Sequence, residues 1–286
     1  MHLDIAQYYS FTDTVFGGNP AAVVVLPRWL DVAMLRNIAA ENNLSETAFL
    51  VAELPTGAVT PPSDAPAYHL KWFTPTTEIE LCGHGTLAAA AHLFATAHPE
   101  TQRLEFWTLS GWLSVTRDGD LYTLDFPADH PAELPEADAD AFAAALVIDR
   151  DHIVEIRRGS SKHVVVVDSP DLVRSVRPDF GKIADLVEHG IILTADATGD
   201  GWDHDIVSRC FAPGVGIDED PVTGSAHTVV GPYWMDQLGR TTLSAFQASA
   251  RGGRLELEQR DDRVLISGHV ALYLTGTITV PDNHLN

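Results

Sequence analysis

Three side chains in the sequence have surroundings that suit proton transfer. Glu46 is the one carboxylate in a strand-like segment, residues 45–51, and His84 stands between two glycines. Cys82 comes just before those glycines, where a helix is expected to begin. A shielded carboxylate can take up and return a proton, imidazole can do so near neutral pH, and a thiolate at a helix N-terminus is a plausible base. The ordinary alternatives are that Glu46 faces water from an edge strand and that His84 is structural.

The segment around His84 is expected to form an anion-binding turn. Residues 80–86 connect an expected strand, residues 69–73, to an apolar run that favours a helix. The first N–H groups of a helix have no partner inside it, so they can bind an anion. Gly83 allows a ligand to approach the backbone closely, and Thr86 is expected to cap the helix. The positive end of the helix dipole is expected to keep the His84 ring neutral.

A similar segment occurs about half a chain later. The two copies are Trp72-Phe73-Thr74-Pro75 followed by Gly85-Thr86, and Cys210-Phe211-Ala212-Pro213 followed by Gly224-Ser225. They are 138 or 139 residues apart, which is how an internal duplication shows itself in one sequence. Two similar halves predict a cleft between them. A racemase with two thiol bases would need a second cysteine opposite Cys82, but Pro221 stands there, so that chemistry is not expected.

The remaining pattern predicts an α+β fold of two lobes. Short alternating strands dominate both halves, and one apolar helix per half suggests a bent, mostly antiparallel sheet around a central helix. A further helix is expected at residues 31–40 with Asp31 as its N-cap. The predicted domains are residues 1–128 and residues 129–286, with the option that the last strand packs back on the first lobe. The boundary is expected in the Pro-, Ala- and acid-rich residues 129–138.

Composition limits the classes of partner. The sequence has 18 Lys and Arg against 40 Asp and Glu, a formal net charge of −22, which repels nucleic acid and anionic membranes. Two cysteines make no disulfide framework, and the N-terminus lacks the pattern of a signal peptide, so a cytoplasmic protein is expected.

No metal site or cofactor is predicted. The acidic run 218–220 is three consecutive carboxylates rather than a spaced coordination loop, and its ordinary reading is a solvated turn before a helix. The histidines show no zinc-site spacing, and the sequence has no nucleotide-binding fingerprint, phosphate loop or nucleophile elbow.

Four ordered motifs together resemble one family across almost the whole chain. They are Phe11-Thr12-Asp13 with Phe16-Gly17-Gly18-Asn19-Pro20-Ala21-Ala22-Val23, Asn43-Leu44-Ser45-Glu46-Thr47-Ala48-Phe49, Leu81-Cys82-Gly83-His84-Gly85-Thr86, and Asp218-Glu219-Asp220-Pro221-Val222-Thr223-Gly224-Ser225-Ala226. In this order they are similar to the PhzF family of phenazine-biosynthesis-type isomerases, within the diaminopimelate epimerase-like superfamily. Cys82-Gly83-His84-Gly85 is also similar to the first thiol motif of proline racemase, while Pro221 in the second motif is of the PhzF kind.

The resemblance implies a cofactor-free, two-lobed homodimer that acts on a small carboxylate substrate. It matches Glu46 to the family's proton-shuttling carboxylate and His84 and Asp220 to the groups that assist it. It matches Gly83, Gly224 and Ser225 to residues that hold the substrate. Asn19 is also expected to bind the substrate. The family's best-known substrate is a dihydro-hydroxyanthranilate.

The expected function is therefore an isomerase that moves a proton on a small carboxylate substrate, with Glu46 acting as base and then as acid. Two alternatives stay open from the sequence. One is an amino-acid epimerase, racemase or dehydratase of the same superfamily. The other is a non-catalytic protein that binds small carboxylates or another protein.

Overall fold

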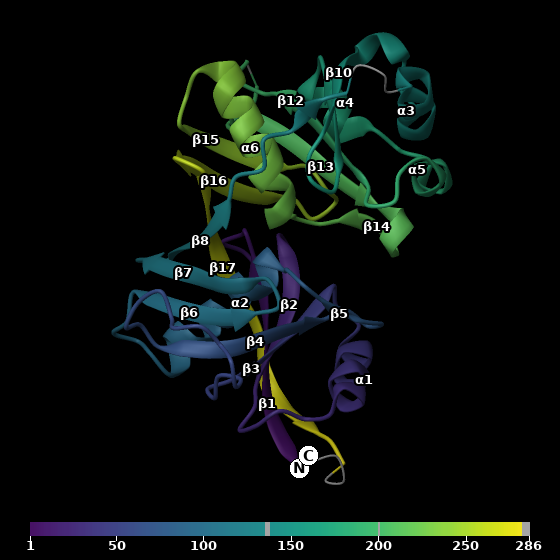
Figure 1. The fold of residues 1–286 in the computed structure, drawn as a ribbon. Coiled ribbons are helices and arrows are strands. Elements are labelled where there is room, and N and C mark those ends of the chain that lie inside the picture. Colours follow the sequence, from purple (N-terminus) through teal and green to yellow (C-terminus); the bar gives the residue numbers. More distant parts are fainter. Residues whose placement is uncertain (135–137, 200, 282–286) are drawn as a thin grey trace. The chain divides into compact units, whose positions relative to one another are not determined.

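The structure is a computed structural model, and it describes residues 1–134, 138–199 and 201–281. The chain divides into two compact units: Met1–Asp125 together with the chain from Ser267 onward, and Phe126–Ile266 (Figure 1). Part of the expected linker, residues 135–137, lies outside the described residues, and Ala132–Glu133 within it forms a short strand, β9.

The first unit combines short strands with two helices. Its elements are β1 (His2–Ser10), β2 (Asn19–Val25), α1 (Val32–Asn42), β3 (Glu46–Val51), β4 (Ala67–Phe73), β5 (Glu78–Ile79), α2 (Gly83–Thr96), β6 (Arg103–Thr108), β7 (Gly111–Asp118), the start of β8 (Leu121–Pro127) and most of β17 (Arg263–Thr279). β1 pairs antiparallel with β2, β2 parallel with β3, and β3 antiparallel with β4. β4 then pairs parallel with β6, β6 antiparallel with β7, and β7 antiparallel with β8. β17 lies antiparallel to β1.

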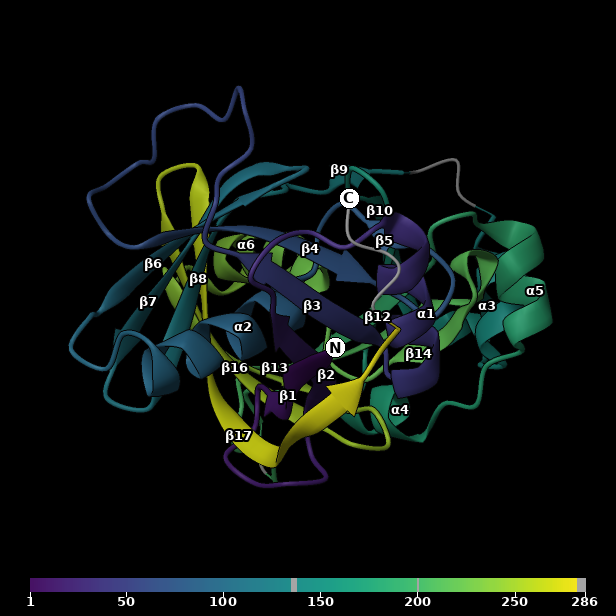
Figure 2. The same ribbon diagram turned by 90° about the horizontal axis from the view of Figure 1, so that it is seen from below.

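Helix α2 is held against the inner strands of this unit. Its side chains are small and apolar on nearly all sides, a pattern typical of a buried helix, and it contacts β1, β2 and β3 (Figure 2). Helix α1 instead begins at the predicted N-cap, because the Asp31 side chain accepts a hydrogen bond of 2.7 Å from the Met34 backbone N–H. It ends at Asn42, and the C-cap residue Asn43 adopts the left-handed conformation that such positions favour.

The second unit repeats the same order of pairings. Its elements are β9, α3 (Ala139–Leu146), η1 (Arg150–His152), β10 (Ile153–Arg158), β11 (His163–Val167), α4 (Pro170–Ser175), α5 (Phe180–Leu186), β12 (Ile191–Asp196), β13 (Ile206–Ala212), η2 (Pro213–Val215), β14 (Ile217–Asp220), α6 (Gly224–Leu238), β15 (Thr242–Gln247) and β16 (Gly253–Arg260). β10 pairs antiparallel with β11, β11 parallel with β12, and β12 antiparallel with β13. β13 then pairs parallel with β15, and β15 antiparallel with β16. Val165, Leu193 and Phe211 from three of these strands lie in its apolar core.

An apolar surface lies on the C-terminal part of β17. Three consecutive side chains there, Leu272, Tyr273 and Leu274, are exposed, so both faces of this short stretch meet solvent. Tyr273 stacks on Tyr9 with ring centroids 5.3 Å apart and meets the exposed Phe16 edge-on. We call the four exposed residues, Phe16, Leu272, Tyr273 and Leu274, the β17 surface.

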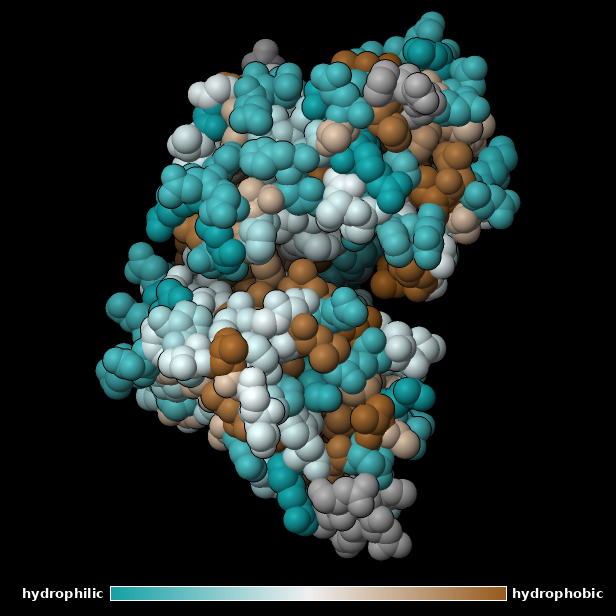
Figure 3. All heavy atoms as spheres, viewed as in Figure 1, coloured by the Kyte–Doolittle hydropathy of each residue, from teal (hydrophilic) through white to brown (hydrophobic). Residues whose placement is uncertain are grey.

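The face of the molecule drawn in Figure 3 is largely hydrophilic, with apolar residues scattered over it. Across the described ranges of the chain, no helix is both long enough and apolar enough to cross a membrane.

Candidate active site

Glu46 and His84 are brought together in the first unit. Glu46 is the first residue of β3, and His84 lies in the first turn of α2. Both are buried, each with only 5% of its surface exposed, and His84 Nε2 lies 2.8 Å from Glu46 Oε2. At this distance His84 is the partner of Glu46 Oε2, which makes no other hydrogen bond to a described residue. A buried carboxylate paired with a buried titratable ring is a candidate functional group.

The strand register explains why the polar residues around this pair gather at one place. Ser10 at the end of β1 lies opposite Asn19 at the start of β2, and β2 runs parallel to β3, which starts at Glu46. Asn19 Nδ2 lies 3.2 Å from His84 Nδ1, and the Ser45 hydroxyl donates to Asn19 Oδ1. The Ser10 hydroxyl donates a hydrogen bond of 2.7 Å to the His84 carbonyl.

Cys82 caps helix α2, a role that the sequence analysis gave to Thr86. The Gly85 N–H donates to Cys82 Sγ at 3.3 Å, while the Thr86 hydroxyl donates to the Cys82 carbonyl at 2.6 Å. Thr86 therefore braces the turn from inside the helix. The first backbone hydrogen bond of the helix runs from the Thr86 N–H to the Cys82 carbonyl. The N–H groups of Gly83 and His84, which come before it, therefore have no partner in the helix.

Charge and burial decide the protonation of this cluster. Burial raises the pKa of the Cys82 thiol to about 11, so at neutral pH it is a thiol rather than a base. Burial alone would lower the pKa of His84, but the negative charges available at Cys82 and Glu46 raise it well above its usual value. With Cys82 protonated, Glu46 is the acting partner.

The raised pKa of His84 is opposite in direction to the neutral ring that was expected. A helix N-terminus contributes about 0.3–1 kcal/mol against a positive charge in its first turn. A carboxylate 2.8 Å from the ring nitrogen has the stronger effect. A doubly protonated ring donates from Nδ1 and needs an acceptor there. The Asn19 amide would then be flipped, with its oxygen facing the ring and its nitrogen donating to the Ser45 hydroxyl.

Trp72 packs behind the turn and makes Gly85 necessary. A Cβ atom at Gly85 would lie 2.9 Å from Cys82 Sγ and 2.9 Å from Trp72 Cδ1. Trp72 is 1% exposed, and its indole N–H has no hydrogen-bond partner among the described residues. Trp72 is the first residue of the repeated segment, but the second copy has Cys210 there, so the repeat did not single out Trp72 and no role was predicted for it.

The second predicted turn, in the second unit, is held by a buried glutamine. Gln247 Oε1 accepts a hydrogen bond of 2.8 Å from the Thr223 N–H, and Gln247 Nε2 donates to the Asp220 carbonyl at 2.7 Å. The Thr223 hydroxyl donates to Asp220 Oδ2 at 2.5 Å. Asp220 ends β14, and Gly224 and Ser225 begin α6. Gln247 was missed because it lies on β15, far from the turn in sequence.

His227 belongs to the frame of this turn. It is fully buried, its Nδ1 lies 2.8 Å from the Thr223 carbonyl, and burial lowers the pKa of its ring to about 4. The neutral ring thus donates to that carbonyl and can accept from the Ser208 hydroxyl, 3.2 Å from Nε2. Such a histidine is a structural group.

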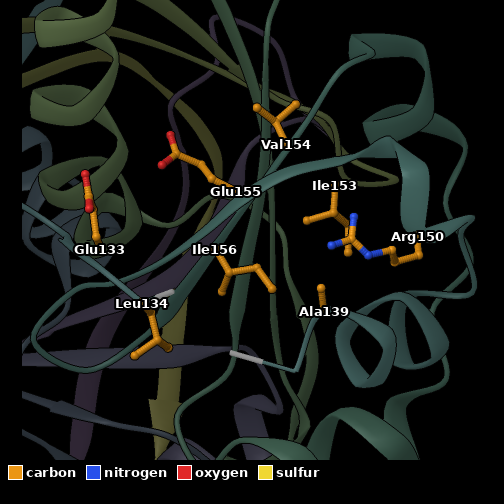
Figure 4. A pocket seen from close by; sticks show the side chains of 8 residues that line it. All are labelled: Glu133, Leu134, Ala139, Arg150, Ile153, Val154, Glu155 and Ile156. Atoms are coloured by element: carbon orange, nitrogen blue, oxygen red, sulfur yellow. The ribbon is translucent and has the colours of Figure 1, made fainter. Parts of the chain in front are cut away.

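A separate cavity of about 440 Å³ lies in the second unit, lined in part by Glu133, Arg150 and Glu155 (Figure 4). Its carboxylates already have partners, because Arg157 contacts both Glu133 and Glu155 and the Tyr233 hydroxyl donates to Glu155. We interpret these groups as a structural ion-pair network.

The mixed sheets and few helices define an α+β fold of the kind found in PhzF-family proteins. Residues 8–276 match the family PhzC-PhzF, described as phenazine biosynthesis-like protein. An uncharacterized isomerase of Pseudomonas aeruginosa is 45% identical over 278 residues, covering 97% of this chain and 99% of that protein. The chain therefore belongs to the PhzC-PhzF family.

Solved structures agree with this assignment. A PhzF-family phenazine biosynthesis protein of Enterococcus faecalis is 42% identical, with a TM-score of 0.87, covering 98% of this chain and 100% of that one. A hydroxyproline epimerase from Agrobacterium vitis shares the fold alone, at 12% identity and a TM-score of 0.58, covering 97% of this chain and 91% of that one.

Proposed function

We propose that this isomerase of the PhzC-PhzF family moves a proton on a small carboxylate substrate, with Glu46 as the acid/base and without a cofactor. The observation that carries the proposal is the buried pair of Glu46 and His84, with Glu46 Oε2 lying 2.8 Å from His84 Nε2. A carboxylate oxygen has two lone pairs, so one is left for an incoming proton beside the contact with His84. The alternative of a solvent-facing carboxylate has little support, because Glu46 is 5% exposed.

In this mechanism His84 sets the charge of the pair. A protonated His84 offsets the negative charge of a Glu46 carboxylate in a buried place where a lone charge would be costly. Glu46 can then remove a proton from a carbon near the substrate carboxylate and return it to another carbon of the same conjugated system. One carboxylate performs both steps, so no second thiol is needed.

The start of α2 supplies the groups that would stabilise the negative charge formed on the substrate. The N–H groups of Gly83 and His84 have no partner in the helix, and backbone donors at a helix N-terminus favour an anion. This local arrangement matters in a chain whose formal net charge is −22, because the overall field repels an anionic substrate.

The remaining predicted site residues are part of the same proposal. Asn19 orients the His84 ring through its contact with Nδ1, and we propose that it also contacts substrate. For Asp220, Gly224 and Ser225 we propose the assisting and substrate-holding roles that the family resemblance implies.

The test is proton exchange in deuterium oxide with a dihydro-hydroxyanthranilate as the probe. Wild-type protein should incorporate solvent deuterium into the recovered compound, and Glu46→Gln should reduce incorporation by at least about 10²-fold, the lower range of acid–base effects. Glu100→Gln, at an exposed glutamate, is the matched control and should leave exchange unchanged. Full exchange by Glu46→Gln would refute the role of Glu46.

The same assay separates the other functions. Exchange at the α-carbon of amino acids, with none on the cyclic probe, would favour an epimerase or racemase. Binding of small carboxylates without any exchange would favour a binding protein.

A homodimer is also part of the proposal, and the β17 surface is its proposed interface. The strand presents three consecutive exposed apolar side chains, and such side chains can pack against the same surface of a second copy around a two-fold axis.

A further inference from the structure

The three residues of the proposed acid–base cluster also form a set of metal ligands. One ligand atom each from Glu46, Cys82 and His84 lies within 4.8 Å of the other two, and all three residues are buried. The set combines a carboxylate oxygen, a thiol sulfur and an imidazole nitrogen. No short sequence motif marks this set, because Glu46 lies at the start of β3 whereas Cys82 and His84 lie at the start of α2.

The separations of these atoms are close to those of a tetrahedral site. Zinc bonds of about 2.3 Å to sulfur and about 2.0–2.2 Å to nitrogen or oxygen put tetrahedral sulfur and nitrogen ligands about 3.6 Å apart, and nitrogen and oxygen about 3.4 Å apart. Cys82 Sγ lies 3.6 Å from His84 Nδ1 and 3.8 Å from Nε2, so this pair needs little change in separation. Glu46 Oε2, now 2.8 Å from Nε2, would have to withdraw by about half an ångström.

Ligand type selects the class of cation. Thiolate and imidazole favour zinc and similar ions, whereas magnesium and calcium prefer oxygen ligands alone. A bound ion deprotonates a coordinating thiol outright, so the burial that keeps Cys82 protonated in the free protein does not prevent binding.

A divalent ion and these ligands together form a neutral site. On binding, any protons on the sulfur and on the coordinating imidazole nitrogen pass to solvent, and the sulfur, nitrogen and oxygen each form one bond to the divalent ion. The thiolate and carboxylate then cancel its two positive charges, so no net charge is added to a buried place.

We propose that Glu46, Cys82 and His84 bind a divalent cation of the zinc class, and that the bound ion inhibits the enzyme by occupying the groups that transfer the proton. Three protein ligands leave the fourth position open to water or to the carboxylate of a ligand. Metal binding itself does not rest on the proposed function; only the inhibition does.

Cobalt(II) titration tests the binding without any substrate. Wild-type protein should develop a near-ultraviolet sulfur-to-cobalt charge-transfer band that saturates at one equivalent, and Zn²⁺ should abolish the band. Cys82→Ala should show no such band. The matched control is Cys210→Ala, which removes the other buried cysteine, lies in the second unit and should keep the full band.

The inhibition is tested on each variant against its own metal-free activity. Zn²⁺ should reduce wild-type exchange at least tenfold, and Cys82→Ala should be at least tenfold less sensitive to it. If Cys82→Ala fails to fold, Cys82→Ser serves in its place and is expected to lose the thiolate band equally. A wild-type protein without a cobalt–thiolate band, or a band that persists in the Cys82 variants, overturns the proposed site. A failure of the exchange assay alone leaves the cobalt result standing, so the two proposals fail separately.

Discussion

Glu46→Gln should lower the pKa of His84 by a measurable amount. The substitution removes a negative charge 2.8 Å from His84 Nε2 and keeps the shape of the side chain. Coulomb's law gives about 6 kcal/mol for such a pair at an effective dielectric constant of about 20, and about 1.5 kcal/mol in water. At about 1.4 kcal/mol per pKa unit, the expected fall is about 1 to 4 units.

The same change should alter how stability depends on pH. In the wild-type protein the folded pKa of His84 is raised above its unfolded value of about 6.5. A raised pKa adds stability that is fully present below the unfolded pKa and is lost as pH rises through the folded pKa. The variant lacks this contribution, so wild-type protein should exceed it in stability most clearly near and below pH 6 and least at high pH.

Two measurements check the coupling. An NMR titration of the histidine ring protons, with the His84 signal assigned by its loss in His84→Asn, gives the pKa directly. Urea unfolding at several pH values gives the stability difference. Glu100→Gln should change neither. An unchanged His84 pKa in Glu46→Gln, or a stability difference that does not vary with pH, would refute the charge coupling that the proposed mechanism requires.

Three further predictions follow from the packing of the first unit. Gly85→Ala should destabilise the protein by about 1–3 kcal/mol, because a new Cβ would lie 2.9 Å from both Trp72 and Cys82. Thermal unfolding should show this loss of stability. The control Gly199→Ala should show none, because its Cβ would meet nothing within 4 Å. Cys82→Ala should lose about 0.5–2 kcal/mol with the helix cap yet keep proton exchange, and an inactive but folded variant would restore Cys82 as a base. Leu272→Lys on the β17 surface should shift a dimer to monomer by light scattering, and a mutant that stays dimeric would exclude this interface.

The local parts of the site could be predicted because their signals are local. Residues 45–51 and 69–73 have the composition of strands and form β3 and β4, and Asp31 is the expected N-cap. The glycines around His84 do begin a helix. These features depend on neighbours in sequence, which a single chain displays.

The rest depends on contacts between distant segments. The contact of Asn19 with His84 follows from the parallel register of β2 on β3 and the place of α2 against both, which no sequence pattern specifies. Helices α3 and α4 were missed because they are short. A helix of this length is marginal by propensity and forms through tertiary packing. The protonation of His84 was misjudged for the same reason, since Glu46 is distant in sequence.

The repeated topology also allows the two copies to be compared position by position. In the first unit Thr47 lies opposite Phe73 in the pairing of β3 with β4, and in the second unit Ile191 lies opposite Phe211 in the pairing of β12 with β13. Phe73 and Phe211 hold the same place in the two copies of the repeated segment. Ile191 is therefore the counterpart of Thr47, and the residue before it is the counterpart of the proposed acid/base.

That counterpart of Glu46 is Gly190, and no side chain can stand there. Its φ is +100°, a conformation that glycine tolerates best, and a Cβ would lie 2.1 Å from the Phe211 carbonyl oxygen. The second copy thus has no room for a carboxylate at the position where the first copy carries its own. A mechanism with two equivalent carboxylate bases, one from each copy, has no second base at this position. The asymmetry favours a single carboxylate that takes up the proton and returns it.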